Sequence, residues 1–206
     1  EQALSLSPNN PSLYLTLARL EVDNGDTEAA RAFIREAVAQ KNNYTEAIFL
    51  LTQIEIAEGN IREAISSVEA ASVIEPNNPV IFFQLGILRY NENDNQGAIA
   101  AFERAVGLND IYANARYFLG LAYERVRRTE DAIQQFENVA TFNPDNEEVK
   151  RILENLRAGR SPFENEVPPP EPPESREDLP VEEDVTLEDT TTSLEEDEGG
   201  SGITTD

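Results

Sequence analysis

The residues whose types and spacing come nearest to a known chemistry lie between Glu92 and Glu103. The places of an EF-hand calcium loop are matched in order by Glu92, Asp94, Gln96, Gly97 and Glu103. However, Glu stands at the first ligand and Gln at the third, where such a loop uses Asp or Asn. The repeat described below also places residues 98–103 inside a helix. We interpret the segment as a turn between helices with solvated acids, and the sequence predicts no metal site and no cofactor.

The composition removes most other catalytic arrangements. The chain has no His and no Cys, so the commonest general base and the thiolate nucleophile are absent. Paired carboxylates could replace His only where burial or a like charge shifts a pKa. The densest acids stand at 182–184 and 195–198, in the predicted disordered tail, where we expect nothing to bury them. We interpret them as solvated charge, and the sequence predicts no catalytic residues and no enzymatic activity.

The charge balance restricts the class of partner. Forty acidic and 16 basic residues give a formal net charge of −24. Nucleic acids and anionic membranes are bound by clustered Lys and Arg, so we expect neither nucleic-acid binding nor direct membrane contact. No apolar run approaches the ~18 residues of a membrane span. These exclusions favour a protein or peptide partner.

The elements that would position any site follow a 34-residue repeat without insertion or deletion. Its columns include Leu17, Leu51, Leu85 and Leu119, then Ala30, Ala64, Ala98 and Ala132, and then Pro8, Asn42, Pro76, Asp110 and Pro144. The frame predicts four repeats, at 11–44, 45–78, 79–112 and 113–146. Before them, 1–10 would be the end of a truncated upstream repeat. After them we expect a capping helix at 147–158 and a disordered, Pro/Glu-rich acidic tail at 159–206.

Each repeat is predicted to form two helices, because apolar residues recur at helical spacing on both sides of a polar break. Asn78 and Asn146 follow prolines and are expected to cap the next helices. One column holds the small residues Ala18, Gly86 and Gly120, which would let two helices cross closely. Thr52 is the larger exception in that column.

This pattern resembles the tetratricopeptide repeat. The fourth repeat carries most of the motif, with Leu119, Gly120, Tyr123, Ala132, Phe136 and Pro144. No repeat has the motif's Trp, and Arg116 occupies that column in the fourth. The resemblance covers residues 1 to about 157 and implies an all-α fold, a right-handed α-solenoid of helix pairs. The resemblance implies an array of a bacterial type, and it is more specific for fold than for function.

In this family the first helix of each repeat lines a concave groove where extended peptides often lie. The resemblance therefore implies three ladders of groove residues. They are Leu15, Phe49, Phe83 and Tyr117, then Arg19, Gln53, Ile87 and Leu121, and then Val22, Ile56, Tyr90 and Glu124. One alternative stays open, namely that these residues mostly pack against the neighbouring first helix. Family members that clamp a terminal carboxylate use several cations here, and these ladders hold one Arg, so we do not expect a carboxylate clamp.

Two hypotheses of function follow, and a third possibility is a passive structural spacer with no ligand. The first is an interaction scaffold or adaptor that binds an extended peptide or a partner helix in the concave groove. The second takes the truncated first repeat as a sign that the array is the soluble C-terminal docking arm of a larger bacterial membrane protein. Such arrays are similar to those in O-antigen ligase-like and polysaccharide polymerase-like proteins, whose catalytic part would lie upstream. The compartment stays open between cytoplasm and periplasm.

The tail offers one further possibility. It is poor in large apolar residues and rich in charge, which is typical of disorder. Within it, prolines at 168–170 and 172–173 favour an extended polyproline segment. Val167 or the Leu179–Val181 region could dock into the chain's own groove, although the negative charge of the repeats opposes this.

Overall fold

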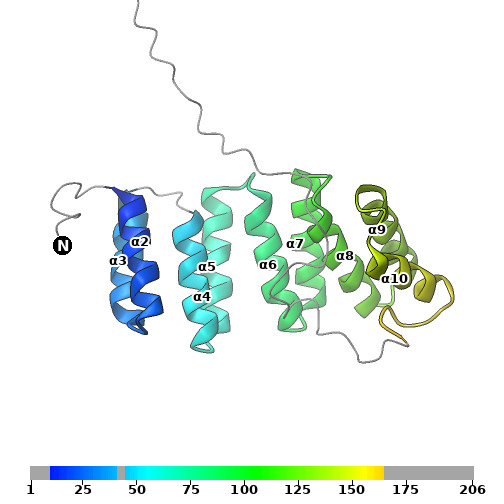
Figure 1. Cartoon of the computed structure of the whole chain (residues 1–206), viewed down its shortest axis with the longest axis horizontal. Helices are drawn as coiled ribbons and strands as arrows, with labels where there is room; N and C mark the ends of the chain where they lie inside the picture. The colour runs from blue at the N-terminus through cyan, green and yellow to red at the C-terminus, as the bar shows by residue number, and fades with distance from the viewer. Residues whose placement is uncertain (1–9, 41–44, 165–206) are drawn as a thin grey trace, which may run out of the picture.

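The computed structural model describes residues 10–40 and 45–164. Within them every regular element is an α-helix, and the helices form a row of pairs (Figure 1). Their bounds are α2 Pro11–Asp23, α3 Thr27–Gln40, α4 Thr45–Ala57, α5 Ile61–Ile74, α6 Pro79–Asn91, α7 Asn95–Leu108, α8 Ala113–Arg125, α9 Thr129–Phe142 and α10 Glu147–Arg157. The expected all-α solenoid of helix pairs is confirmed. Apart from Asn10, the expected upstream repeat lies outside the described residues, as does the tail beyond Glu164.

The helices begin where the sequence supplies a cap. The Asn78 side chain accepts a hydrogen bond from the Val80 amide at 3.0 Å, and Asn146 accepts one from Val149 at 3.0 Å. Both expected caps are therefore confirmed. Asp94, from the calcium-like segment, accepts a hydrogen bond from the Gly97 amide at 3.0 Å and caps α7. A carboxylate at a helix N-terminus satisfies a free amide and needs no metal to explain it.

Small residues set the approach of the two helices within a repeat. Gly120 in α8 lies under the Phe136 ring of α9, and a Cβ added there would stand 2.7 Å from a ring carbon. Gly86 in α6 meets Phe102 of α7 in the same way. The helices pack this closely because no side chain separates them, as the small-residue column predicted.

The apolar core is divided along the row. The largest cluster spans α6 to α10 and includes a set of aromatic rings: Phe83, Phe102, Phe118, Tyr117 and Phe136. Two smaller, mainly aliphatic clusters belong to α2–α4 and to α4–α7. Arg116, in the family's Trp column, is held by hydrogen bonds from its guanidinium to the Asp110 carbonyl at 2.7 Å and to Gln135 at 3.0 Å.

Successive repeats are joined by polar pairs that the sequence analysis did not identify. Each pair links residues 20 apart, on the first helix of one repeat and the second helix of the repeat before. The donor-to-acceptor distances are 2.6 Å for Arg89–Glu69, 2.6 Å for Tyr123–Glu103 and 2.8 Å for Arg157–Glu137. Between repeats 1 and 2 the charges are reversed, because Glu55 and Arg35 occupy these positions. This junction instead uses Arg31, whose guanidinium lies 3.9 Å from Glu55.

The chain turns back on α10 after that helix ends. Gly159 has a φ of 72°, which a glycine adopts readily. The buried Asn155 amide then donates hydrogen bonds to the carbonyls of Pro162, at 3.0 Å, and Glu164, at 3.1 Å. Phe163 packs against the large core cluster. Packed structure therefore continues to Glu164, past the point where the tail was expected to begin.

Candidate functional site

A pocket of about 470 Å³ lies between the first helices of repeats 1 and 2, α2 and α4. Its apolar surface comes from Val22, Phe49 and Leu50, and its polar surface from Arg19, Asp23, Glu46 and Gln53. Four of these were expected groove residues: Arg19, Val22, Phe49 and Gln53. They come together because residues 34 apart stand at equivalent places on adjacent first helices. We call this site the α2–α4 pocket.

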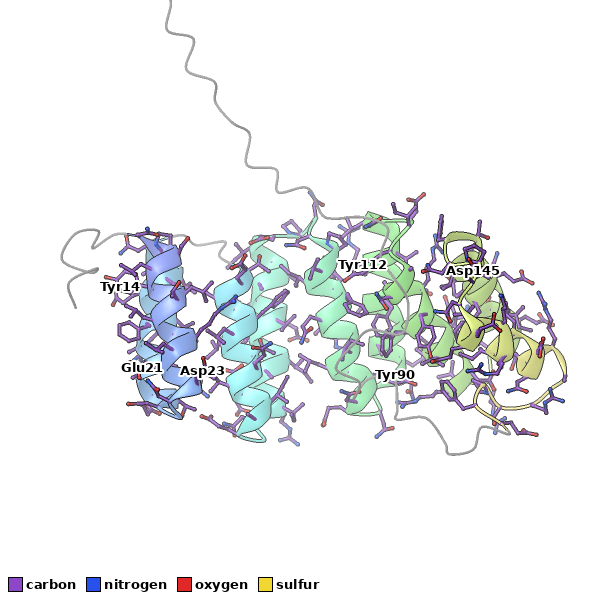
Figure 2. The ribbon with its side chains drawn as sticks, in the orientation of Figure 1. Tyr14, Glu21, Asp23, Tyr90, Tyr112 and Asp145 are labelled. Carbon is purple, nitrogen blue, oxygen red and sulfur yellow. The ribbon has the colours of Figure 1, made fainter. Side chains whose placement is uncertain are left out.

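The charges of the α2–α4 pocket are unequal. The Arg19 guanidinium lies 3.9 Å from the Glu46 carboxylate, and both side chains are largely exposed. Asp23, at the end of α2, adds a second acid (Figure 2). Because one cation faces two carboxylates, the pocket favours a neutral or basic ligand with an apolar anchor.

The twelve expected groove residues differ in exposure along the row. In repeats 1 and 2, Arg19, Gln53 and Ile56 are exposed, Val22 and Phe49 are half-buried, and Leu15 belongs to the core. In repeats 3 and 4, Ile87 and Glu124 are half-buried and the other four are buried, namely Phe83, Tyr90, Tyr117 and Leu121. The structure therefore groups the ladders into an open half and a buried half.

Aromatic packing accounts for part of the burial in repeats 3 and 4. The Phe83 ring centre lies 5.1 Å from that of Tyr112 and 5.8 Å from that of Phe118. The Arg125 guanidinium lies 3.3 Å from the Tyr90 ring centre and donates a hydrogen bond to the Tyr90 carbonyl at 2.7 Å. Tyr90 and Tyr112 both lie in the part of the molecule formed by α6 to α8 (Figure 2). Phe83 and Tyr90, which were expected to line the groove, therefore pack within the array and stabilise it.

The hydroxyl of Tyr117 links α8 to α10 by donating a hydrogen bond to Glu148. Glu148 stands 34 residues after Asn114 and 102 after Glu46, so it belongs to the same column as a residue of the α2–α4 pocket. The sequence analysis missed this column, along with Asp23 and Leu50. The column lies one helical turn before the ladder of Leu15, Phe49, Phe83 and Tyr117, and that spacing was the available signal.

Two titratable groups behind this face have shifted pKa values. Burial raises the pKa of Glu55 above its ordinary value, although Ser67 donates it a hydrogen bond at 3.2 Å and Arg31 lies nearby. One of its carboxylate oxygens, Oε2, has no hydrogen-bond partner. Burial, together with the hydrogen bond to Glu103, raises the pKa of Tyr123 to about 12. Both groups belong to the junctions between repeats, where they affect stability.

Residues 10–40 and 45–164 contain neither a candidate metal site nor a candidate membrane span. The acids there form no group of three or more that could hold a metal ion. Among the same residues, no helix combines the length and the apolar character needed to cross a bilayer. Both findings concern only that part of the chain.

The fold and the site together define an α-solenoid built from repeated helix pairs with a pocket between first helices. Two family models, both described as tetratricopeptide repeat, match the chain, one at residues 1–54 and 21–82 and the other at 83–147. The chain belongs to the tetratricopeptide repeat family.

Three individual proteins are similar to this chain. The human protein O-mannosyl-transferase TMTC1 is 24% identical over 160 residues, which are 76% of this chain and 18% of that protein. The chain therefore spans less than a fifth of this curated relative. The crystal structure of MamA has a TM-score of 0.62 at 23% identity, covering 72% of this chain and 81% of MamA. YrrB, described as having an unusual peptide-binding site, has a TM-score of 0.61 at 21% identity, covering 77% of this chain and 81% of YrrB. The two structures show likeness of fold.

Proposed function

We propose that this chain is a protein-interaction scaffold that binds an extended peptide across the first helices of repeats 1 and 2. The observation that carries the proposal is the α2–α4 pocket. Its volume of about 470 Å³ is within the range of ligand-binding clefts. It combines an apolar floor with charged edges, which is the pattern that lets an apolar side chain anchor a peptide while polar groups fix its register. The described peptide-binding site of YrrB, a protein of the same fold, supports this interpretation.

The chemistry of the pocket specifies the peptide. Phe49 and Leu50 offer an apolar surface for one anchor side chain, while Asp23 and Glu46 attract a basic residue beside it. The formal charge of −24 adds a long-range attraction for basic partners. We therefore expect a neutral or basic peptide with an apolar anchor.

A peptide library tests the proposal, because it does not require an identified partner. Random dodecamer peptides displayed on phage are selected against the full chain, and the dissociation constants of the enriched peptides are measured on variants. Gln53→Trp fills the pocket from an exposed position of α4 and is expected to weaken binding about tenfold or more. Ser66→Trp, at an exposed position of α5 outside the pocket, is the matched control and should leave binding unchanged. Equal affinities for both variants, or no enriched peptides, would contradict the proposal.

A second candidate function is a docking arm on a larger membrane protein with catalytic residues elsewhere. The match to TMTC1 favours it, because there a similar stretch forms 18% of a protein named as a transferase. An antibody against the tail, applied to fractionated source cells, distinguishes the two. A much larger band in the membrane fraction supports the docking arm, whereas a soluble band of this chain's size contradicts it.

A further inference from the structure

The first helices of successive repeats end at equivalent places, and in the later half one of these ends holds a cation. The last residues are Asp23 of α2, Ala57 of α4, Asn91 of α6 and Arg125 of α8. The Arg125 guanidinium lies 3.3 Å from the Tyr90 ring centre of α6 and donates a hydrogen bond to the Tyr90 carbonyl at 2.7 Å. That carbonyl belongs to the last turn of α6, where the free peptide carbonyls of a helix concentrate negative charge. The molecule therefore contains a guanidinium site at the end of a first helix.

The equivalent place at the end of α2 has the same acceptor, but the residue that would supply the cation is small. Val22 stands two repeats before Tyr90, and its carbonyl accepts one hydrogen bond, from the Gly25 amide at 2.9 Å. A carbonyl oxygen has two lone pairs, so it can accept a second donor, as the Tyr90 carbonyl accepts Arg125. Ala57 stands two repeats before Arg125, and its methyl group cannot reach across to α2. The last turn of α2 itself holds no basic residue.

Asp23 adds a carboxylate at this place. Its side chain is exposed and lines the α2–α4 pocket together with Val22, and Asp23 and Tyr90 lie at the same edge of the row of helices (Figure 2). The nearby Arg19 guanidinium lies 3.9 Å from Glu46, and within residues 10–40 and 45–164 no cation forms an ion pair with Asp23. An acid at the end of a helix is unfavourable in the free protein, because the helix dipole is negative there, and both charges favour a bound cation.

We propose that the end of α2 binds an arginine side chain of the peptide in the α2–α4 pocket, with Asp23 as the residue that determines this specificity. The guanidinium donates to the Val22 carbonyl and to the Asp23 carboxylate at once, because its planar fork of N–H groups can serve two acceptors. A lysine ammonium is a compact point charge and matches the pair of acceptors less well. The apolar anchor of the same peptide lies on Phe49 and Leu50. This inference rests on the proposed function and narrows its ligand to a peptide with an arginine beside an apolar residue.

The dodecamer peptides selected on phage against the full chain test this inference. The enriched peptides are expected to share an arginine near an apolar residue. Dissociation constants are then measured for the tightest peptide and for versions with that arginine replaced by alanine or by lysine. The alanine peptide should bind about tenfold or more weakly, because charge-assisted hydrogen bonds are lost, and the lysine peptide should be intermediate. Enriched apolar peptides without arginine would overturn the inference and leave the proposed function standing, whereas the absence of any enriched peptide would overturn both.

Two variants test whether the arginine binds at the end of α2. Ala57→Arg, at an exposed position, supplies a guanidinium from α4 as Arg125 does from α8, and Asp23→Asn removes the carboxylate. In each variant the affinity difference between the arginine and alanine peptides should shrink to about threefold or less, because one acceptor is occupied or weakened. Ser66→Arg, at an exposed position of α5 outside the pocket, adds the same charge and should preserve the full difference. An unchanged difference in Ala57→Arg and Asp23→Asn, or an equal loss in Ser66→Arg, would overturn the inference.

Discussion

Repeats 1 and 2 differ from repeats 3 and 4 although the same 34-residue frame builds both. In the later repeats, Gly86 and Gly120 face Phe102 and Phe136. In the earlier ones, Ala18 and Thr52 occupy the glycine column, while Ile34 and Val68 occupy the phenylalanine column. Large and small residues are thus exchanged together, which conserves the volume between the two helices of a repeat. Equivalent backbones can therefore be reached by two different packing solutions.

The difference also affects what each half offers a ligand. The later half packs rings from α6, α7, α8 and α9 into one cluster, with Phe118 in contact with four other rings. Among the described residues of the earlier half, Tyr14 and Phe33 form the single ring pair, with centres 6.4 Å apart. Aromatic packing and stability are therefore expected to be concentrated at one end of the array, and the α2–α4 pocket at the other.

The largest expected effect comes from removing a ring in the later half. Phe118 is fully buried, so Phe118→Ala should lower the free energy of unfolding by about 3–5 kcal/mol. Urea unfolding followed by circular dichroism measures this loss. Tyr14→Ala, in the earlier half, removes a half-buried ring and should cost only about 1–2 kcal/mol. Equal losses would mean that the two halves do not differ in packing.

A smaller effect is expected from filling the close contact in repeat 4. Gly120→Val places side-chain atoms against the Phe136 ring and should destabilise the fold by about 1–3 kcal/mol. Gly107 is the matched control, because it lies in α7 with open space around it. Gly107→Ala should be neutral or stabilise by up to about 1 kcal/mol. Thermal unfolding of both variants tests whether the small residues of this column are needed for close packing of the two helices. If Gly120→Val left the stability unchanged, close packing would not explain the column.

The smallest expected effect concerns the junction between repeats 1 and 2. Burial raises the pKa of Glu55 in the folded protein. The carboxyl therefore contributes fully to the free energy of unfolding only below the pKa that Glu55 has in the unfolded chain. That contribution is lost as the pH rises through the folded-state pKa. Glu55→Gln should therefore stabilise the protein at neutral pH, by about 0.5–1 kcal/mol, and lose this advantage in acid. Urea unfolding as a function of pH measures the difference.

Glu58 supplies a control of opposite sign on the same Arg31. The Arg31 guanidinium lies 2.6 Å from Glu58 and holds its pKa below the ordinary value. Its contribution is present above the unfolded-state pKa and is lost as the pH falls. Glu58→Gln should thus reduce stability slightly at neutral pH and converge with the parent protein in acid. If both variants changed the stability at neutral pH in the same direction, the opposite pKa shifts of Glu55 and Glu58 would not explain the pH dependence of this junction.

Much of the fold was open to prediction from particular residues. The 34-residue columns predicted the helix pairs, because a repeat that cannot bury its own apolar face must stack on its neighbour. The capping roles of Asn78 and Asn146 could be predicted from the sequence, because capping depends on residues within one helical turn. The pairs 20 residues apart, such as Arg89–Glu69, were missed because their spacing matches no helical period. Asn155 and Phe163 were missed because their roles depend on the turn after α10.

Periodicity was enough to predict the repeat and the helix pairs, whereas the exclusion of nucleic-acid and membrane partners from the charge stays a prediction. Periodicity and composition were not enough to predict which ladder residues line an open pocket, because that depends on tertiary packing. Arg19, Phe49 and Gln53 line it, while Phe83 and Tyr117 are buried, although all belong to the same repeating columns. Exposure differs within a column because it depends on the neighbours that surround each position. Those neighbours come from other helices, whose side chains vary from repeat to repeat.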